Sequence, residues 1–154
     1  MYDATPLLKY LKDSGILYKV DWHPRTTTAL QTAEAEHVSG KHFAKTVVLV
    51  AGDRKILAVL PADLKVDVER LARLTGKADL RLASESDFSY LFPNCEVGAM
   101  PPFGNLCTFE VLVDDDLATA AEVTFNACTH LHTITVSGED FLRATGGKVV
   151  DFNQ

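Results

Sequence analysis

Lys45 is the residue whose place in the chain most favours chemistry. It stands before Thr46 and the run Val47 to Ala51, which has the composition of a buried strand. An ammonium at the entrance of such a strand loses hydration unless it reaches water or an anion, so the pattern indicates that Lys45 projects from the strand end into a pocket. The alternative is a surface lysine with its charge in water, and the pattern alone favours that alternative.

The second candidate is the segment from Gly98 to Gly104, which contains Met100, Pro101, Pro102 and Phe103. Prolines lack a backbone donor and glycines permit unusual dihedral angles, so we expect a stiff, shaped loop. The N–H groups of such a loop can stabilise a carbonyl oxygen that gains negative charge during ester hydrolysis. A plain connector between a helix and a strand is the alternative, and the sequence leaves both open.

Three further candidates, Cys128, His130 and His132, lie close together at the start of a predicted strand. An imidazole with a pKa of about 6.5 can move a proton, and His130 could also bind a ribose hydroxyl. A histidine that is hydrogen-bonded within the fold is the alternative. A thiol nucleophile with Cys128 and His130, or a metal site with His130 and His132, is less favoured because each lacks a supporting third group.

Composition limits the class of protein and its partners. The 154 residues fit one domain, 1–154, and 47% hydrophobic with 23% charged residues is ordinary for a globular protein. The N-terminus has no signal-peptide pattern, and no apolar run approaches the roughly 18 residues of a membrane span, so we expect a cytoplasmic protein without a membrane partner. The net charge of -6 counts against DNA or extensive nucleic-acid binding. A local basic patch could still touch the end of a nucleic-acid chain; it would draw on Lys9, Lys12, Lys41, Lys45 and Lys148.

Cysteine usage and motif searches give no sign of a bound group. Cys95, Cys107 and Cys128 are odd in number and widely spaced, which argues against a disulfide framework and predicts reduced, buried thiols. Walker, dinucleotide-binding, zinc-protease and calcium-loop motifs are absent from the sequence. We therefore expect neither a cofactor nor a metal.

Caps and periodicity predict an α+β domain built on a mixed, curved sheet with helices packed outside it. In one strand, Ile16, Tyr18, Val20 and Trp22 share the side that we expect to be buried. Residues 114–116 are predicted to form an acidic turn. Helices are predicted near 5–15, 27–37, 68–75, 84–92 and 137–144. Strands are predicted near 16–22, 45–51, 55–60, 80–82, 106–113, 122–126, 133–136 and 148–152.

Several stretches together carry a resemblance to a known family. They are His23 through Thr28-Ala29, the Lys45 strand, Leu60-Pro61-Ala62-Asp63, Val66-Asp67, Leu82-Ala83-Ser84, the loop Gly98 to Gly104, and Asn126-Ala127-Cys128-Thr129-His130. With these residues the chain resembles the YbaK family, the domain inserted in many bacterial prolyl-tRNA synthetases as their editing domain and also found alone as deacylases. The resemblance covers nearly the whole chain and implies a barrel-like sheet.

The resemblance also implies an activity: hydrolysis of the ester of a mischarged tRNA that carries a small amino acid, without a metal. The implied partner is the aminoacylated 3' end of tRNA, with an aminoacyl-tRNA synthetase as an open second partner. The implied catalytic residues are Lys45, Gly98, Pro102 and Gly104. The expected substrate-binding residues are Thr28, Leu30, Thr46, Met100, Pro101, Phe103, Cys128, Thr129 and His130.

One departure from the family pattern is Cys128, which stands where relatives often carry glycine. This substitution bears on which amino acid the pocket takes rather than on the reaction. Two other classes remain open from the sequence. A module that binds aminoacyl-tRNA without turnover would need the same pocket, whereas a purely structural protein would leave Lys45 and the loop without a common purpose.

Overall fold

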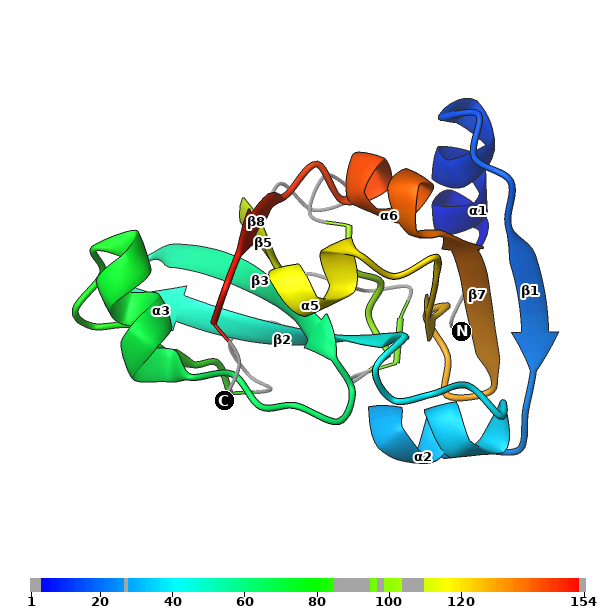
Figure 1. Ribbon diagram of the computed structural model, residues 1–154, viewed down its shortest axis with the longest axis horizontal. Coiled ribbons are helices and arrows are strands. Elements are labelled where there is room, and N and C mark those ends of the chain that lie inside the picture. Colours follow the sequence, from blue (N-terminus) through cyan, green and yellow to red (C-terminus); the bar gives the residue numbers. More distant parts are fainter. Residues whose placement is uncertain (1–3, 27, 85–94, 97–98, 104–109, 153–154) are drawn as a thin grey trace.

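The computed structural model describes residues 4–26, 28–84, 95–96, 99–103 and 110–152 (Figure 1). The predicted helix at 84–92 lies almost entirely outside these residues, as do Gly98, Gly104 and the first part of the predicted strand 106–113. Among the described residues, no helix is long and apolar enough to cross a membrane.

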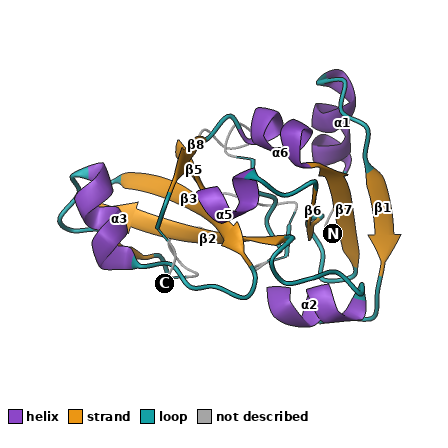
Figure 2. Cartoon of the chain, in the orientation of Figure 1, coloured by secondary structure: helices purple, strands orange, loops and turns teal. Residues whose placement is uncertain are grey.

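Five described helices accompany the strands (Figure 2). They are α1 (Thr5–Asp13), α2 (Ala29–Ala35), α3 (Val68–Thr75), α5 (Asp115–Ala118) and α6 (Gly138–Thr145). The helix α3 begins and ends as its sequence predicts, because Asp67 Oδ1 accepts the Arg70 N–H at 3.1 Å and Gly76 takes the left-handed φ of 70°. In the same way Ser137 Oγ accepts the Asp140 N–H at 3.1 Å at the start of α6.

The described strands form one mixed, open sheet in the order β1-β7-β6-β2-β3-β5-β8, with β4 paired to β2 beside this path. They are β1 (Lys19–Trp22), β2 (Phe43–Ala51), β3 (Arg54–Pro61), β4 (Arg81–Leu82), β5 (Glu110–Asp114), β6 (Glu122–Asn126), β7 (His132–Ser137) and β8 (Lys148–Val150). The predicted hairpin of β2 and β3 is confirmed, and the α+β class with a mixed sheet is confirmed as well.

Two apolar cores lie on opposite faces of β2 and β3, which explains why both strands are hydrophobic throughout. The first core contains Ala44 and Val48 of β2 and packs against α1 and α6. The second contains Leu49 and Ala51 of β2 and packs against Leu71 of α3. Successive residues of β2 therefore point alternately into the two cores.

Three local predictions are corrected by the structure. The α1 N-cap is Ala4 and not Thr5, which is already helical. Residues 114–116 do not form a turn, because Asp114 caps the short helix α5. The side of β1 that was expected to be buried is exposed beyond Ile16, because Tyr18, Val20 and Trp22 belong to none of the apolar cores formed by the described residues.

Candidate active site

The part of the candidate loop that is described, residues 99–103, lies against the turn that follows β6. The Cys128 N–H donates to the Ala99 carbonyl at 3.0 Å, and the Glu96 N–H donates to the Cys128 carbonyl at 2.8 Å. Two of the sequence candidates, the loop and the Cys128–His130 turn, are thus brought together by main-chain hydrogen bonds.

Glu96 adds a charged clamp to this contact. Its Oε2 accepts the His130 backbone N–H at 2.8 Å, and its Oε1 lies 2.8 Å from Nη2 of Arg25. The His130 Nε2 is 4.0 Å from Glu96 Oε2. The hydrogen bond from the Arg25 guanidinium, followed by that from the His130 N–H, holds the pKa of the Glu96 carboxyl below its usual range, although partial burial acts in the opposite direction. Glu96 is therefore a carboxylate that joins three segments.

Cys95 and Cys128 form a disulfide, which corrects the expectation of reduced thiols. Sequence spacing gave no sign of it, because the two residues are 33 positions apart and meet only through the pairing of the loop with the turn. As a disulfide, the Cys128 sulfur is not a thiolate, so a nucleophilic role with His130 does not apply to this state. Cys128 also has a φ of 70°, in the left-handed region that glycine adopts without strain. Glycine would therefore fit this position without backbone strain.

Lys45 is half-buried near the start of β2, at the level of the same turn. Ala44 pairs with Phe125 in the parallel β2–β6 ladder, so Lys45 directly follows the last β2 residue of that ladder. Burial lowers the pKa of the Lys45 ammonium below the lysine value, with the Asp63 carboxylate acting against this effect and Lys65 adding to it. Lys45 is therefore a cation that has lost part of its hydration.

The side chains of Lys45 and Thr46 point to opposite faces of the sheet, because successive strand residues alternate. Thr46 shares the face of Ala44 and Val48, which is also the face of Met100 and Phe103. Among the described residues, neither a hydrogen bond nor an ion pair joins Lys45 to residues 99–103. The two strongest candidates thus lie on opposite faces of the sheet at β2.

That edge of β2 changes neighbours along its length. Residues 43–44 pair with β6, whereas residues 49–50 pair with β4. Within the described part of the chain, no strand pairs with residues 45–47 on this side, a stretch of roughly 10 Å at about 3.3 Å per residue. Lys45 and Thr46 are therefore placed where the sheet splits.

The remaining candidates are distributed around this split. Thr28 is the N-cap of α2 and accepts the Gln31 N–H, and Leu30 of α2 lies beside Gly40 and Asp63. Thr129 Oγ1 is 2.9 Å from Nδ1 of His132. Met100, Pro101 and Pro102 are buried, and Phe103 is fully buried among Tyr10, Phe125 and Phe141.

The comparison with known sequences decides the family. A family model described as the aminoacyl-tRNA editing domain matches residues 23–144. The chain belongs to this family. Every catalytic or substrate-binding residue implied by the resemblance, from Thr28 to His130, falls inside the matched range, whereas α1 and β1 precede it.

Relatives of this editing-domain protein occur both inside a synthetase and alone. It is 28% identical to a proline–tRNA ligase of Thiobacillus denitrificans over 68% of this chain, but the match covers only 18% of the ligase. It is 27% identical to the multifunctional Ser/Thr-tRNA deacylase ProXp-y of Escherichia coli K12, over 96% of this chain and 91% of that protein. Among solved structures, a candidate trans-editing enzyme for prolyl tRNA synthetase matches with a TM-score of 0.86 and 25% identity, covering 98% of this chain and 96% of the other.

Sequence reasoning missed three charged residues of this editing domain. Arg25 and Glu96 are 71 positions apart, so no local pattern could pair them. In the sequence, Asp63 stood out only as part of the family signature. Its carboxylate nevertheless has the largest effect of any charged group on the Lys45 pKa. Asp63 also borders a hollow of about 390 Å³, whose other lining residues are Lys41, His42, Pro61, Leu64, Asp116, Thr119 and Ala120.

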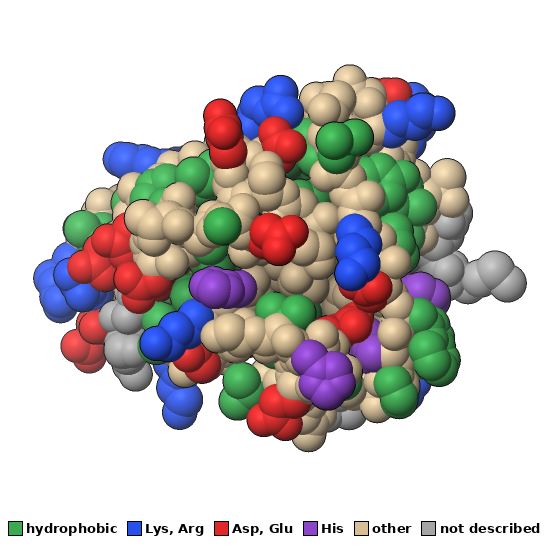
Figure 3. Space-filling view, turned by 45° about the vertical axis from the view of Figure 1, so that its right-hand side comes forward, with side chains coloured by type: hydrophobic (Ala, Val, Ile, Leu, Met, Phe, Trp, Pro, Cys, Tyr) green, Lys and Arg blue, Asp and Glu red, His purple; other side chains and the backbone are tan. Residues whose placement is uncertain are grey.

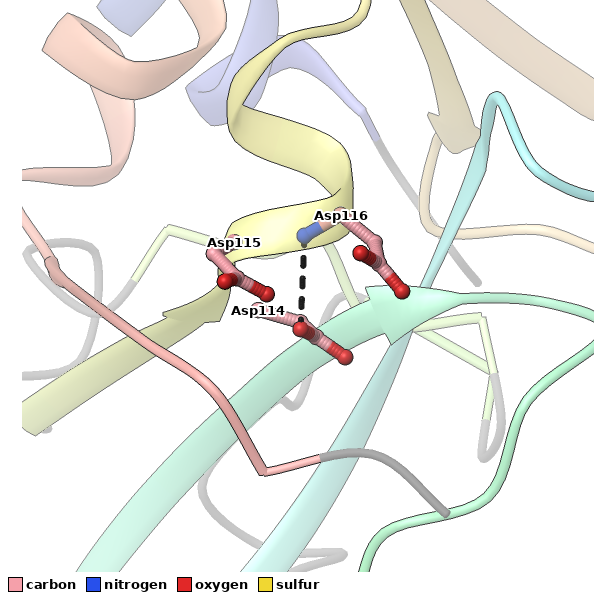
Figure 4. Close-up of side chains that lie close together, drawn as sticks. All are labelled: Asp114, Asp115 and Asp116. Atoms are coloured by element: carbon pink, nitrogen blue, oxygen red, sulfur yellow. Dashed lines mark hydrogen bonds between the residues drawn. The ribbon is translucent and has the colours of Figure 1, made fainter.

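An acidic trio at the start of α5 has a structural explanation. Oxygen atoms of Asp114, Asp115 and Asp116 lie within 4.8 Å of one another (Figure 4). The Asp116 N–H donates to Asp114 Oδ1 at 3.3 Å, as an N-cap requires. Asp115 and Asp116 are exposed in the first helical turn, where negative charge is favourable. The trio is therefore accounted for as a helix start.

Proposed function

We propose that this chain is a freestanding, metal-independent aminoacyl-tRNA deacylase that hydrolyses the ester of a mischarged tRNA carrying a small amino acid, such as alanine, cysteine, serine or threonine. The observation that carries the proposal is the extent of the likeness: an editing domain with nearly the same boundaries as a protein named as a Ser/Thr-tRNA deacylase.

The loop is the proposed oxyanion site. Pro101 and Pro102 have no N–H, and the Ala99 N–H already donates to the Glu96 carbonyl at 3.0 Å. Following the family resemblance, the proposal assigns the donors to Gly98 and Gly104, the first and last residues of the loop. Fixed N–H groups of this kind stabilise the negative charge that develops on the ester carbonyl oxygen.

Lys45 is the proposed anchor for the terminal nucleotide. Its ammonium has lost hydration, so a phosphate oxygen restores interactions that the protein does not supply. Because Lys45 and Thr46 face opposite sides at the split of the sheet, the tRNA end would cross the β2 edge. In this arrangement the phosphate lies on the Lys45 side and the amino acid on the side of the loop.

His130 and the adjacent ribose hydroxyl complete the proposed chemistry. The Glu96 carboxylate holds the His130 backbone N–H, and the imidazole Nε2 lies 4.0 Å from Glu96 Oε2. In the proposal this imidazole faces the ester held by the loop. Water attacks the carbonyl carbon, the bond to the ribose oxygen breaks, and that oxygen takes up a proton. Positioning supplies most of the rate in such a site, which agrees with the lack of a strong acid–base pair.

The test is deacylation of a panel of mischarged tRNAs by the purified protein. We expect hydrolysis of alanyl-, cysteinyl-, seryl- or threonyl-tRNA, unaffected by a metal chelator and reduced at least about 100-fold in Lys45→Ala. Lys77→Ala is the matched control, since it removes one lysine charge outside the candidate site and should keep full activity. Binding of charged tRNA without release of amino acid would instead support a binding module.

A further inference from the structure

The strand β1 presents an unusual surface at one end of the sheet. Tyr18 just before this strand, and Val20 and Trp22 within it, lie at alternate positions and are 38%, 47% and 66% exposed. In the ribbon view β1 forms the outermost strand on its side of the molecule (Figure 1). With that side turned forward, hydrophobic side chains lie at the right-hand margin of the surface, close to charged ones (Figure 3).

At alternate residues of β1, the backbone N–H and C=O groups point away from β7 and toward the open edge. The His23 N–H donates to the Leu131 carbonyl at 2.9 Å, and His23 is opposite Leu131 when the β1–β7 register is continued. In an antiparallel pair, directly opposite residues alternate between bonded and non-bonded pairs. Asp21 and Lys19 therefore bond to β7, whereas the N–H and C=O groups of Val20 point away from the sheet.

The sequence of this edge is self-complementary. Reading outward from Val20 in both directions gives Lys19 and Asp21, which have opposite charges, and then Tyr18 and Trp22, which are both aromatic. In a second copy related by a two-fold axis at Val20, each residue would pair with the residue that lies equally far from Val20 in the opposite direction. Lys19 would then face Asp21 of the partner subunit, and Tyr18 would face Trp22 of the partner subunit.

We propose that β1 is a homodimer interface, in which two copies pair antiparallel about Val20 and join their sheets into one. The outward groups of Val20 then form two hydrogen bonds with Val20 of the partner subunit, because a directly opposite bonded pair exchanges both. Lys19 and Asp21 lie in the non-bonded pair, where side chains come closest. Within one chain Lys19 Nζ is already 3.5 Å from Asp21 Oδ2, so the dimer extends this contact into a ring of four alternating charges.

The size and place of the edge agree with a weak, reversible dimer. The strand has four residues, and the apolar contribution comes chiefly from two aromatic side chains per copy, so the buried area falls in the class below about 1,200 Å². The edge also precedes residues 23–144, the range matched by the family model. Dimerisation through β1 would therefore use a part of the chain outside the matched range, and it would place the two aromatic stripes side by side on one face of the joined sheet.

The experiment is sedimentation of the full-length chain at concentrations from about 1 to about 300 μM, a range suited to interfaces of this class. We expect concentration-dependent dimers in the wild type. Lys19→Asp alone and Asp21→Lys alone should each weaken association at least about tenfold, because each places like charges opposite one another. Both side chains lie at the surface, so circular dichroism should show that each variant keeps its fold.

Two recombinations test the register. The double variant with both changes should dimerise again, since each reversed charge meets the other in the partner. A mixture of the two single variants should form a heterodimer more strongly than either forms a homodimer. A monomeric wild type at every concentration would overturn the proposal, as would dimers that ignore all of these charge changes. If the stripe instead serves tRNA, the wild type stays monomeric and Trp22→Ala weakens tRNA binding, which also overturns it.

Discussion

The carboxylate of Glu96 accepts the backbone N–H of His130 at 2.8 Å, and this bond fastens two segments that are 34 residues apart in the sequence. The same carboxylate faces the Arg25 guanidinium. Glu96→Gln keeps the shape but replaces charge-assisted bonds with weaker neutral ones. We expect a loss of roughly 1 kcal/mol in the free energy of unfolding and a fall in deacylation, measured by denaturant titration and single-turnover kinetics. Arg25→Gln, which changes only the more exposed partner, should cost less stability; an equal loss in both variants would contradict this account of the clamp.

Stability should depend on acid pH through the same carboxyl. The pKa of Glu96 is lower in the fold than its ordinary value of 4.5, chiefly because of the Arg25 hydrogen bond. A depressed carboxyl pKa contributes stability that is present above the unfolded pKa and is lost as the pH falls through the folded pKa. The stability advantage of wild type over Glu96→Gln should therefore be full near pH 6 and shrink below pH 4.5. Thermal unfolding of both proteins across this range measures it, and an advantage that grows on acidification would rule out the assignment.

The Cys95–Cys128 disulfide closes a loop of 33 residues and should stabilise the oxidised chain by roughly 2 to 4 kcal/mol relative to the reduced one. Denaturant unfolding with and without a dithiol measures the difference. Alkylation of the unfolded, oxidised protein should modify Cys107 alone, whereas prior reduction should expose all three cysteines. Modification of all three without a reductant would show that the bond does not form under those conditions.

Cys128 offers a matched pair of variants that separates the backbone from the bond. Both Cys128→Gly and Cys128→Ala remove the disulfide, but only alanine keeps a Cβ at the φ of 70°. A left-handed conformation costs a residue with a Cβ about 1 kcal/mol relative to glycine. Under reducing conditions the glycine variant should therefore be more stable than the alanine variant by about that amount. Equal stability would mean that the turn relaxes to another conformation.

Local chemistry explains which parts of the fold were predictable. Asp67 and Gly76 mark the ends of α3 within a few residues, and the hydrophobic runs of β2 and β3 are separated by one tight turn, so nearest neighbours in the sequence determine these elements. The burial of β1 was predicted wrongly because alternation is the same in an edge strand and in a strand covered on one face. Only the sheet order, which depends on distant pairings, places β1 at the edge.

The candidate site was predictable in part for the same reason. Lys45 and the loop stood out through composition, and the family resemblance joined them, but the sequence could not show that Lys45 and Thr46 lie at a split between β6 and β4. The Glu96 clamp and the disulfide arise only when the loop meets the turn after β6. Contacts made between segments far apart in the chain leave no periodic signal.

Asp63 should tune the charge of Lys45. Its carboxylate favours the protonated ammonium and so opposes the lowering of the Lys45 pKa by burial. Asp63→Asn removes that support, and the Lys45 pKa should fall further below 10.5. The charged anchor would then be lost at a lower pH, so the alkaline limb of the deacylation profile should shift toward neutrality after correction for spontaneous ester hydrolysis. Heteronuclear NMR of the lysine side chains measures the pKa directly. Asp53→Asn, a change in the β2–β3 turn, is the control, and an alkaline shift of equal size in that variant would show that Asp63 has no specific effect on Lys45.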